Sequence, residues 1–258
     1  MRKTIFTLLA AAMLVACNKP NGQMADGLTQ EWDKKFPKSE LVNHQKVTFE
    51  TQYGLTLAAD LYTPQSIQLS EVSNQKLPAI AVSGPFGAIK EQCSGLYAQA
   101  LAERGFVTLA FDPSYTGESS GEPRRTASPD INTEDFLAAV DYLSKLPEVD
   151  AERIGILGIC GWGGIALNAA AADPRIKATV ASTMYDMTRV SGNGYYDSAD
   201  QEEARHGARE ALAQQRLADP LAMAGGVIDP LPDKSAKFAM SAYCKSTEWK
   251  CFCDNKIL

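Results

Sequence analysis

Short apolar runs that alternate with helical segments constrain the fold of this 258-residue chain more than any other feature. Each run has the length of a strand and no polar alternation, which is typical of strands that helices cover on both faces of a parallel sheet. The four runs are residues 77–83, 106–111, 154–159 and 176–181. Three helices are predicted between them: one from residue 93 to a stop at Gly105, one from a cap at Asn132 or Thr133 to Pro147, and one over residues 163–172.

A hairpin is predicted before these units. Apolar and polar residues alternate on both sides of Tyr53-Gly54, so residues 47–62 indicate two antiparallel strands. Together, these patterns predict an α/β fold, a doubly wound parallel sheet with an N-terminal β-hairpin. Sites in such sheets form beyond the carboxyl ends of the strands.

The composition excludes several classes of protein. A hydrophobic fraction of 45% supports one large globular core. The net charge of −6, with no local cluster of Lys and Arg, argues against a nucleic-acid partner. Six cysteines are too few for a disulfide scaffold. No apolar run reaches the roughly 20 residues that span a bilayer, so we expect no integral membrane protein.

The N-terminus resembles a bacterial lipoprotein signal. Two basic residues precede an apolar stretch over residues 5–16, which ends in Leu14-Val15-Ala16-Cys17. The resemblance implies that residues 1–16 are removed and that Cys17 carries acyl chains. The alternative is an ordinary secretory signal with an incidental cysteine. The Asn18 that follows implies a lipid anchor at the cell envelope, on the periplasmic side of the outer membrane.

Residues 17–46 are polar and contain glycine and proline, so they predict a tether. His44, at its end, is expected to be solvated.

One junction between a strand and a helix predicts chemistry. In Gly158-Ile159-Cys160-Gly161-Trp162-Gly163-Gly164, glycines flank a cysteine that follows a buried strand. This is the pattern of a nucleophile elbow with Cys in place of Ser, on an exposed rim of the sheet. The N-terminus of the next helix would favour the thiolate of Cys160. The alternative is a small buried thiol selected for packing.

The sequence resembles the α/β-hydrolase superfamily, near bacterial dienelactone hydrolases and Xaa-Pro dipeptidyl-peptidase-like hydrolases. The resemblance covers about residues 47–243 and is most specific over residues 83–92, 110–119 and 158–177. It implies Cys160 as the nucleophile and an oxyanion hole formed by the backbone N–H groups of Gly161 and Phe86. Trp162 departs from the plain elbow, which has glycine two residues after the nucleophile. The acids of residues 112–118 are expected to be structural.

The resemblance also implies an acid and a histidine after the nucleophile. Asp186, after the fourth apolar run, is a weak candidate for the acid. His206 is a weak candidate for the base, and a solvated position on a charged helix is the favoured interpretation. The predicted organisation is therefore a partial hydrolase core over residues 47–190 and a helical lid or insert over 191–243, an incomplete α/β-hydrolase fold.

Residues 244–258 form a divergent tail, which indicates a truncated or frame-shifted C-terminus. Cys244, Cys251 and Cys253 match no common zinc spacing and lack a fourth ligand, so no metal and no cofactor are expected.

Two functions follow from this pattern. The first is hydrolysis of esters or related acyl bonds of a small molecule by Cys160, impaired by loss of the acid and histidine region. The alternative is a non-catalytic lipid-anchored surface protein or a defective fragment of a hydrolase. The acyl group and the oligomeric state are not determined by these patterns.

Overall fold

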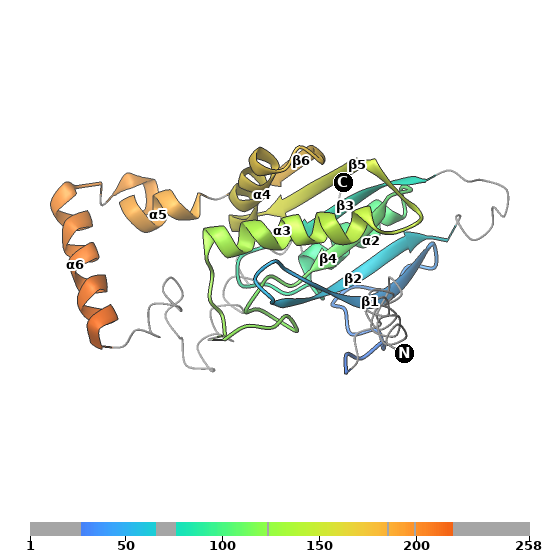
Figure 1. The fold of residues 1–258 in the computed structure, drawn as a ribbon, viewed down its shortest axis with the longest axis horizontal. Helices are drawn as coiled ribbons and strands as arrows, with labels where there is room; N and C mark the ends of the chain where they lie inside the picture. Colours follow the sequence, from blue (N-terminus) through green and yellow to red (C-terminus); the bar gives the residue numbers. More distant parts are fainter. Residues whose placement is uncertain (1–26, 66–75, 123, 185, 199, 219–258) are drawn as a thin grey trace, which may run out of the picture.

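The structure is a computed structural model that describes residues 27–65, 76–122, 124–184, 186–198 and 200–218 (Figure 1). Its strands are β1 (Val42–Glu50), β2 (Thr56–Pro64), β3 (Leu77–Ser83), β4 (Val107–Phe111), β5 (Val149–Ile159) and β6 (Ile176–Ser182). Its helices are α2 (Cys93–Ala102), α3 (Pro129–Ser144), α4 (Gly161–Ala172), α5 (Met187–Asn193), the 3₁₀ helix η1 (Tyr195–Asp197) and α6 (Glu202–Ala218).

The six strands form one sheet in the order β1-β2-β4-β3-β5-β6. The predicted hairpin is confirmed, because β1 and β2 pair antiparallel around the turn at Tyr53-Gly54. β2 also pairs antiparallel with β4, whereas β4, β3, β5 and β6 are mutually parallel. The carboxyl ends of the four parallel strands therefore lie at one edge of the sheet, where a site is expected.

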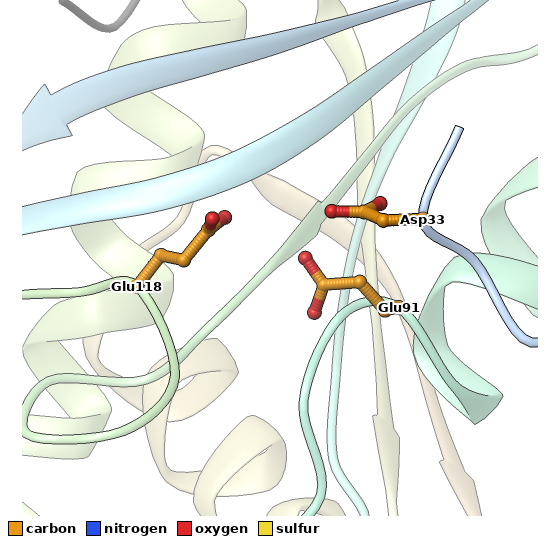
Figure 2. Close-up of side chains that lie close together, drawn as sticks. All are labelled: Asp33, Glu91 and Glu118. Carbon is orange, nitrogen blue, oxygen red and sulfur yellow. The ribbon is translucent and has the colours of Figure 1, made fainter. Parts of the chain in front are cut away.

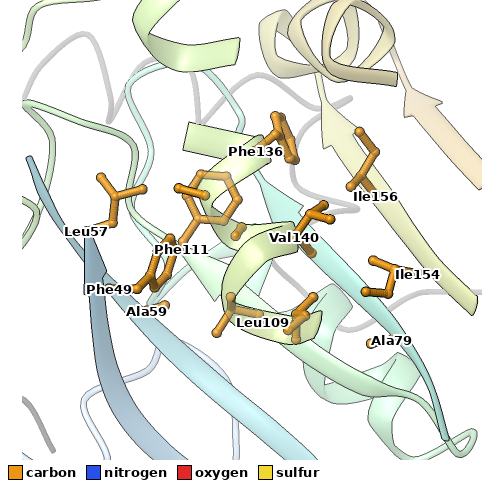
Figure 3. Close-up of a cluster of buried hydrophobic side chains, with 14 of the residues drawn as sticks. Phe49, Leu57, Ala59, Ala79, Leu109, Phe111, Phe136, Val140, Ile154 and Ile156 are labelled. Atoms are coloured by element: carbon orange, nitrogen blue, oxygen red, sulfur yellow. The ribbon is translucent and has the colours of Figure 1, made fainter. Parts of the chain in front are cut away.

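Helices cover both faces of the sheet. α3 and α4 pack on one face around the larger core cluster, and α2 packs on the other face (Figure 1). In the larger cluster, Phe111 of β4 meets Phe136 of α3 edge-on, with ring centroids 5.1 Å apart (Figure 3). All five residues of β4 are buried, as a continuous apolar run predicts for a central strand.

Two predicted elements need correction. α3 begins at Pro129, before the predicted cap, because proline at the first helical position needs no N–H partner. Asn132 instead lies inside the helix, where its side-chain oxygen accepts a hydrogen bond from the Ser128 N–H at 2.9 Å. β6 is not covered on both faces, since Val180 is 52% exposed. Within the described residues, β6 pairs only with β5 and is an edge strand.

The segment before the sheet is packed rather than a tether. Trp32 donates from Nε1 to the carbonyl of Phe36 at 2.8 Å, and Phe36 is buried. The last part of the predicted tether forms the start of β1, so the prediction is wrong for the described residues from 27 onward. His44 is also not solvated: only 3% of its side chain is exposed, and its Nε2 lies 2.8 Å from Oδ1 of Asp60.

The segment after β6 contains α5, η1 and α6, which extend away from the sheet (Figure 1). The predicted charged helix is confirmed as α6, a helix without a buried residue. Residues 219–243 of the predicted lid, the divergent tail and Cys17 lie outside the described residues. No helix in the described ranges is long and apolar enough to cross a membrane.

Candidate active site

Cys160 occupies a sharp turn between β5 and α4. Its backbone has φ 59° and ψ −123°, a region that a residue with a side chain rarely adopts. The turn is held by backbone hydrogen bonds, because the Cys160 N–H donates to the Ser182 carbonyl and the Gly163 N–H donates to the Cys160 carbonyl, both at 2.9 Å. This is the strained geometry that the glycine-flanked cysteine predicts.

Close backbone approaches explain the glycines around this turn. A Cβ atom on Gly158 would lie 2.1 Å from the carbonyl oxygen of Trp162. A Cβ atom on Gly84, in the loop after β3, would lie 2.4 Å from the carbonyl oxygen of Ile159. The turn at Cys160 therefore requires glycine, which has no Cβ atom, at both positions.

The two residues of the predicted oxyanion hole, Gly161 and Phe86, lie next to each other. The Cβ of Phe86 is 3.4 Å from the position that a Cβ on Gly161 would occupy. The Phe86 ring also packs edge-on against Trp162, with ring centroids 5.4 Å apart. Trp162 is 3% exposed and joins the core, which gives the departure from the plain elbow a packing role. Gly161 and Phe86 thus belong to two segments that meet beside Cys160.

The thiol itself is more enclosed than the sequence predicts. Cys160 is 9% exposed and packs with Val82, Leu157 and Ile159 in the core cluster on the α2 face. The expectation of an exposed rim is therefore wrong. This burial therefore restricts the access of a reagent to Cys160.

Comparisons with known proteins find a matching family model and similar chains. Residues 66–186 match the model of the Dienelactone hydrolase family. The chain is similar to PA2218, an uncharacterized protein of Pseudomonas aeruginosa, with 62% identity over 208 residues, 81% of this chain and 54% of that protein. The crystal structure of PA2218 matches with a TM-score of 0.73 at 58% identity, covering 85% of this chain and 68% of that one.

A structural match decides the superfamily. The crystal structure of the alpha/beta hydrolase GrgF from Penicillium matches with a TM-score of 0.50 at 25% identity, covering 69% of this chain and 68% of that one. The chain belongs to the α/β-hydrolase superfamily. It is also 33% identical over 142 residues to a thiohydrolase of Aspergillus aculeatus, aneE, covering 55% of this chain and 42% of that protein. The chain spans about half the length of the curated relatives it matches.

The histidine that this superfamily uses is not placed beside Cys160 within the described ranges. The chain contains two histidines. His44 lies in β1, at the far end of the sheet from β5 and β6, and its ring is committed to Asp60. His206 lies on α6 with 64% of its side chain exposed, 3.3 Å from Glu210 of the same helix. The expectation of a solvated His206 is confirmed.

Asp186 has a local role in the structure. It is the N-cap of α5, and its Oδ1 accepts hydrogen bonds from the Arg189 N–H at 2.9 Å and from the Thr188 hydroxyl at 2.8 Å. These hydrogen bonds, with the one from Arg189 the largest, hold the pKa of the Asp186 carboxyl below its ordinary value. The structure does not bring Asp186 and His206 together with Cys160 as a triad.

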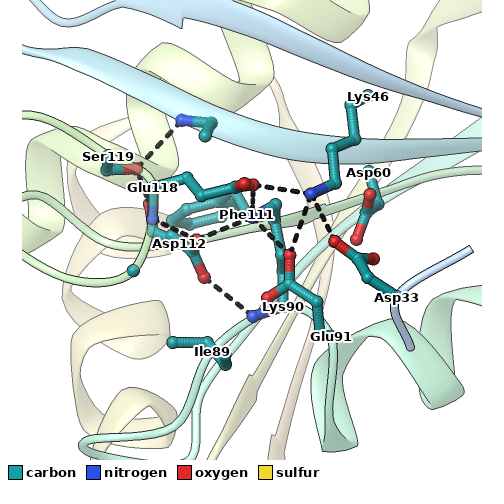
Figure 4. A network of polar contacts seen from close by, with 12 residues as sticks. Asp33, Lys46, Asp60, Ile89, Lys90, Glu91, Phe111, Asp112, Glu118 and Ser119 are labelled. Atoms are coloured by element: carbon teal, nitrogen blue, oxygen red, sulfur yellow. Dashed lines mark hydrogen bonds and ion pairs between the residues drawn. The ribbon is translucent and has the colours of Figure 1, made fainter. Parts of the chain in front are cut away.

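Apart from the turn at Cys160, the fold contains a cluster of polar side chains on the α2 face of the sheet. His44 and Lys46 of β1 stand opposite Tyr62 and Asp60 of β2 in the pairing register, so the four side chains share one face. Charged residues from three further segments join them (Figure 4). The added members are Asp33 and Lys34 before β1, Lys90 and Glu91 after β3, and Asp112 and Glu118 after β4.

Three carboxylates of this network converge as a metal site would (Figure 2). They belong to Asp33, Glu91 and Glu118. However, the ammonium Nζ of Lys46 lies 2.7 Å from Asp33, 2.8 Å from Glu118 and 3.4 Å from Glu91. A lysine already supplies the positive charge there, so the donor set fits an ion-pair network and not a resident metal ion.

Burial perturbs the ionisation of this network. Burial raises the pKa of Asp112 to about 6, although the nearby Lys90 favours the charged form. Burial also lowers the pKa of Lys90, but the charges of Asp112 and Glu91 outweigh it, and the net pKa lies above its ordinary value. The predicted structural role of residues 112–118 is confirmed by these contacts. The buried lysines were not predicted, because the sequence carries no signal that pairs them.

Proposed function

We propose that this chain cleaves activated acyl bonds of small molecules, with Cys160 as the nucleophile. The observation that carries the proposal is the strained turn at Cys160, where Gly161 at the start of α4 lies next to Phe86 of the loop after β3. A nucleophile on such a turn is presented at the N-terminus of a helix, where free N–H groups stabilise a developing oxyanion. The resemblance to a thiohydrolase supports an acyl substrate.

The proposed reaction has two steps. The Cys160 thiol loses its proton to water and its sulfur attacks the acyl carbonyl carbon. A C–S bond forms, the bond to the leaving group breaks, and the leaving group departs as its anion, which water can protonate. Water then attacks the resulting thioester, releases the carboxylic acid and returns the thiol. During both steps, the N–H groups of Gly161 and Phe86 hold the carbonyl oxygen.

The proposal limits the reaction to activated substrates. Neither His44 nor His206 is positioned to remove the proton of Cys160. General base catalysis contributes about 10²–10⁴ in rate, so plain alkyl esters are expected to react too slowly to detect. An activated aryl ester has a leaving group that needs no acid assistance. Impaired turnover is therefore part of the proposed function.

An acyl-enzyme experiment tests this function. Wild type, Cys160→Ala and Cys93→Ala are incubated with p-nitrophenyl acetate, and p-nitrophenolate release and acetylated peptides are measured. We expect a slow, Cys160-dependent release and an acetyl group on the peptide that contains Cys160. Cys93→Ala, which removes a thiol on α2, should behave as wild type. Equal release from Cys160→Ala would contradict the proposal and favour the non-catalytic surface protein.

We also propose that Cys17 anchors the protein at the cell envelope. The support is the apolar stretch that ends in Leu14-Val15-Ala16-Cys17. Each buried CH₂ of an acyl chain contributes about 0.8 kcal/mol, so several chains hold a protein on a bilayer. Cys17→Ser should move the protein from the membrane fraction to the soluble fraction after cell lysis. Unchanged partition would refute the anchor.

A further inference from the structure

Helix α5 is attached to the hydrolase core through its first residue. The short helix packs mainly on η1 and lies beyond the sheet (Figure 1). Its N-terminus is fixed by the Asp186 cap, and Met187 follows that cap directly. Unlike the exposed Thr188 and Arg189, Met187 is half-buried. This side chain points back to the turn that carries Cys160.

Met187 lies against Gly161. A Cβ atom on Gly161 would be 3.0 Å from Cγ and 3.2 Å from Sδ of Met187. The same position is 3.4 Å from Cβ of Phe86. The Met187 thioether therefore lies against Gly161, on the side of this residue that also faces the Phe86 side chain.

The position of Met187 beside the start of α4 relates it to the proposed reaction. Every Cα–Cβ bond of an α-helix is tilted toward the helix N-terminus. Gly161 is the first residue of α4, so its missing Cβ points to the end of the helix where Cys160 and the free N–H groups lie. Met187 therefore lies near the end of α4 where an acyl group on Cys160 would be held.

We propose that Met187 is a specificity-determining residue that restricts the Cys160 site to small, apolar acyl groups. Its Cγ and Sδ lie 3.0 and 3.2 Å from the position of a Cβ on Gly161, so the side chain occupies this side of Gly161 and must move to admit a bulky acyl group there. Methionine is flexible and apolar, so it can shift for a short aliphatic chain and pack against it. This inference rests on the proposed role of Cys160 as the acyl acceptor.

Met184 offers a matched control. It also packs its side chain on a glycine of α4, with Cγ 3.1 Å from the position of a Cβ on Gly163. Gly163 lies two residues further into the helix and away from the Phe86 contact. Truncation of Met184 removes a similar thioether from the same segment without opening the space beside Gly161.

The test measures thiol access and acyl preference separately. The rate at which Cys160 is alkylated is measured by peptide mapping, once with iodoacetamide and once with N-pyrenylmaleimide. The proteins compared are wild type, Met187→Ala, Met187→Leu and Met184→Ala. Met187→Ala removes the side chain that lies over Gly161. We therefore expect it to raise the alkylation rate of Cys160 with the bulky maleimide by about tenfold or more, and the rate with iodoacetamide by less. Met187→Leu, which keeps the volume, and Met184→Ala should stay within about twofold of wild type.

Turnover of p-nitrophenyl acetate and octanoate provides the second measurement. Met187→Ala should raise the octanoate-to-acetate ratio of kcat/KM, whereas Met184→Ala should leave it unchanged. If neither wild type nor any variant forms an acyl-enzyme, the proposed function fails. The alkylation rates still show whether the Met187 side chain limits access to Cys160. Equal maleimide rates in Met187→Ala and Met184→Ala would overturn the role of Met187. Thermal unfolding of each variant confirms that the fold is retained.

Discussion

Replacing Lys90 with methionine is expected to lower the free energy of unfolding by about 3–5 kcal/mol. The Lys90 ammonium lies 2.8 Å from Asp112, 2.7 Å from Glu91 and 2.5 Å from Glu118, and its side chain is fully buried. Methionine fills a similar volume but carries no charge. The buried carboxylate of Asp112 then loses its ammonium partner, and an unpaired buried charge is costly.

The measurement is urea unfolding at neutral pH, with an exposed ion pair as control. Lys177 lies 3.5 Å from Glu152, and the two side chains are 46% and 85% exposed. Lys177→Met should change the free energy of unfolding by less than about 1 kcal/mol, because surface pairs contribute little. If Lys90→Met also lowered the free energy of unfolding by less than about 1 kcal/mol, the buried network would not stabilise the fold.

The effect of Lys90→Met should also depend on pH. Burial raises the pKa of Asp112 to about 6, above the ordinary value of 3.8, so the folded state binds this proton more tightly than the unfolded state. Protonation of Asp112 therefore adds to the free energy of unfolding. This contribution is fully present below pH 3.8 and is lost as the pH rises through about 6. Removal of Lys90 raises the pKa of Asp112 further. The variant should therefore lose less stability near pH 5 than near pH 8, and an equal loss would contradict the role of Asp112.

The second large effect is expected from Gly84→Ala, which should destabilise the fold by about 3 kcal/mol or more. Gly84 has φ 97°, and a new Cβ would lie 2.4 Å from the Ile159 carbonyl oxygen and 2.8 Å from Cβ of Trp162. Neither atom belongs to a flexible side-chain end. The backbone before Cys160 or the loop that carries Phe86 must move, so Cys160-dependent acylation should also fall.

Gly87→Ala is the matched control for this change. Gly87 lies in the same loop with φ 78°, but nothing lies within 4 Å of an added Cβ. It tests the cost of the left-handed backbone alone, about 1–2 kcal/mol. Urea unfolding and p-nitrophenyl acetate acylation of both variants separate the two causes. If Gly84→Ala costs no more than Gly87→Ala, the close approach to the Ile159 carbonyl does not constrain the elbow.

Local patterns predicted the elements that depend on local chemistry. The hairpin around Tyr53-Gly54 follows from alternation, and the turn at Cys160 follows from glycines placed between a strand and a helix. Both signals lie within a few residues of the structure they specify. The start of α3 at Pro129 was missed, although proline at the first helical position was an available signal.

Long-range contacts account for what the sequence could not predict. The segment with Lys34 is polar and resembles a linker, yet the Lys34 side chain is fully buried on Asp60 of β2. Such burial depends on partners that come from distant segments. Met187 likewise carries no local signal, because its contact with Gly161 exists only once α4 and α5 meet.

The ion-pair network on the α2 face also sets an order of events during synthesis. Lys46 pairs with Glu118, which is 72 residues later in the chain. At a synthesis rate of about 5–20 residues per second, Glu118 follows Lys46 from the ribosome by about 4–14 s. During that interval, the hairpin can pair its backbone and Lys46 can pair with Asp33, but the ion pair between Lys46 and Glu118 cannot form. The network on the α2 face is therefore complete only after the loop that follows β4 has been made.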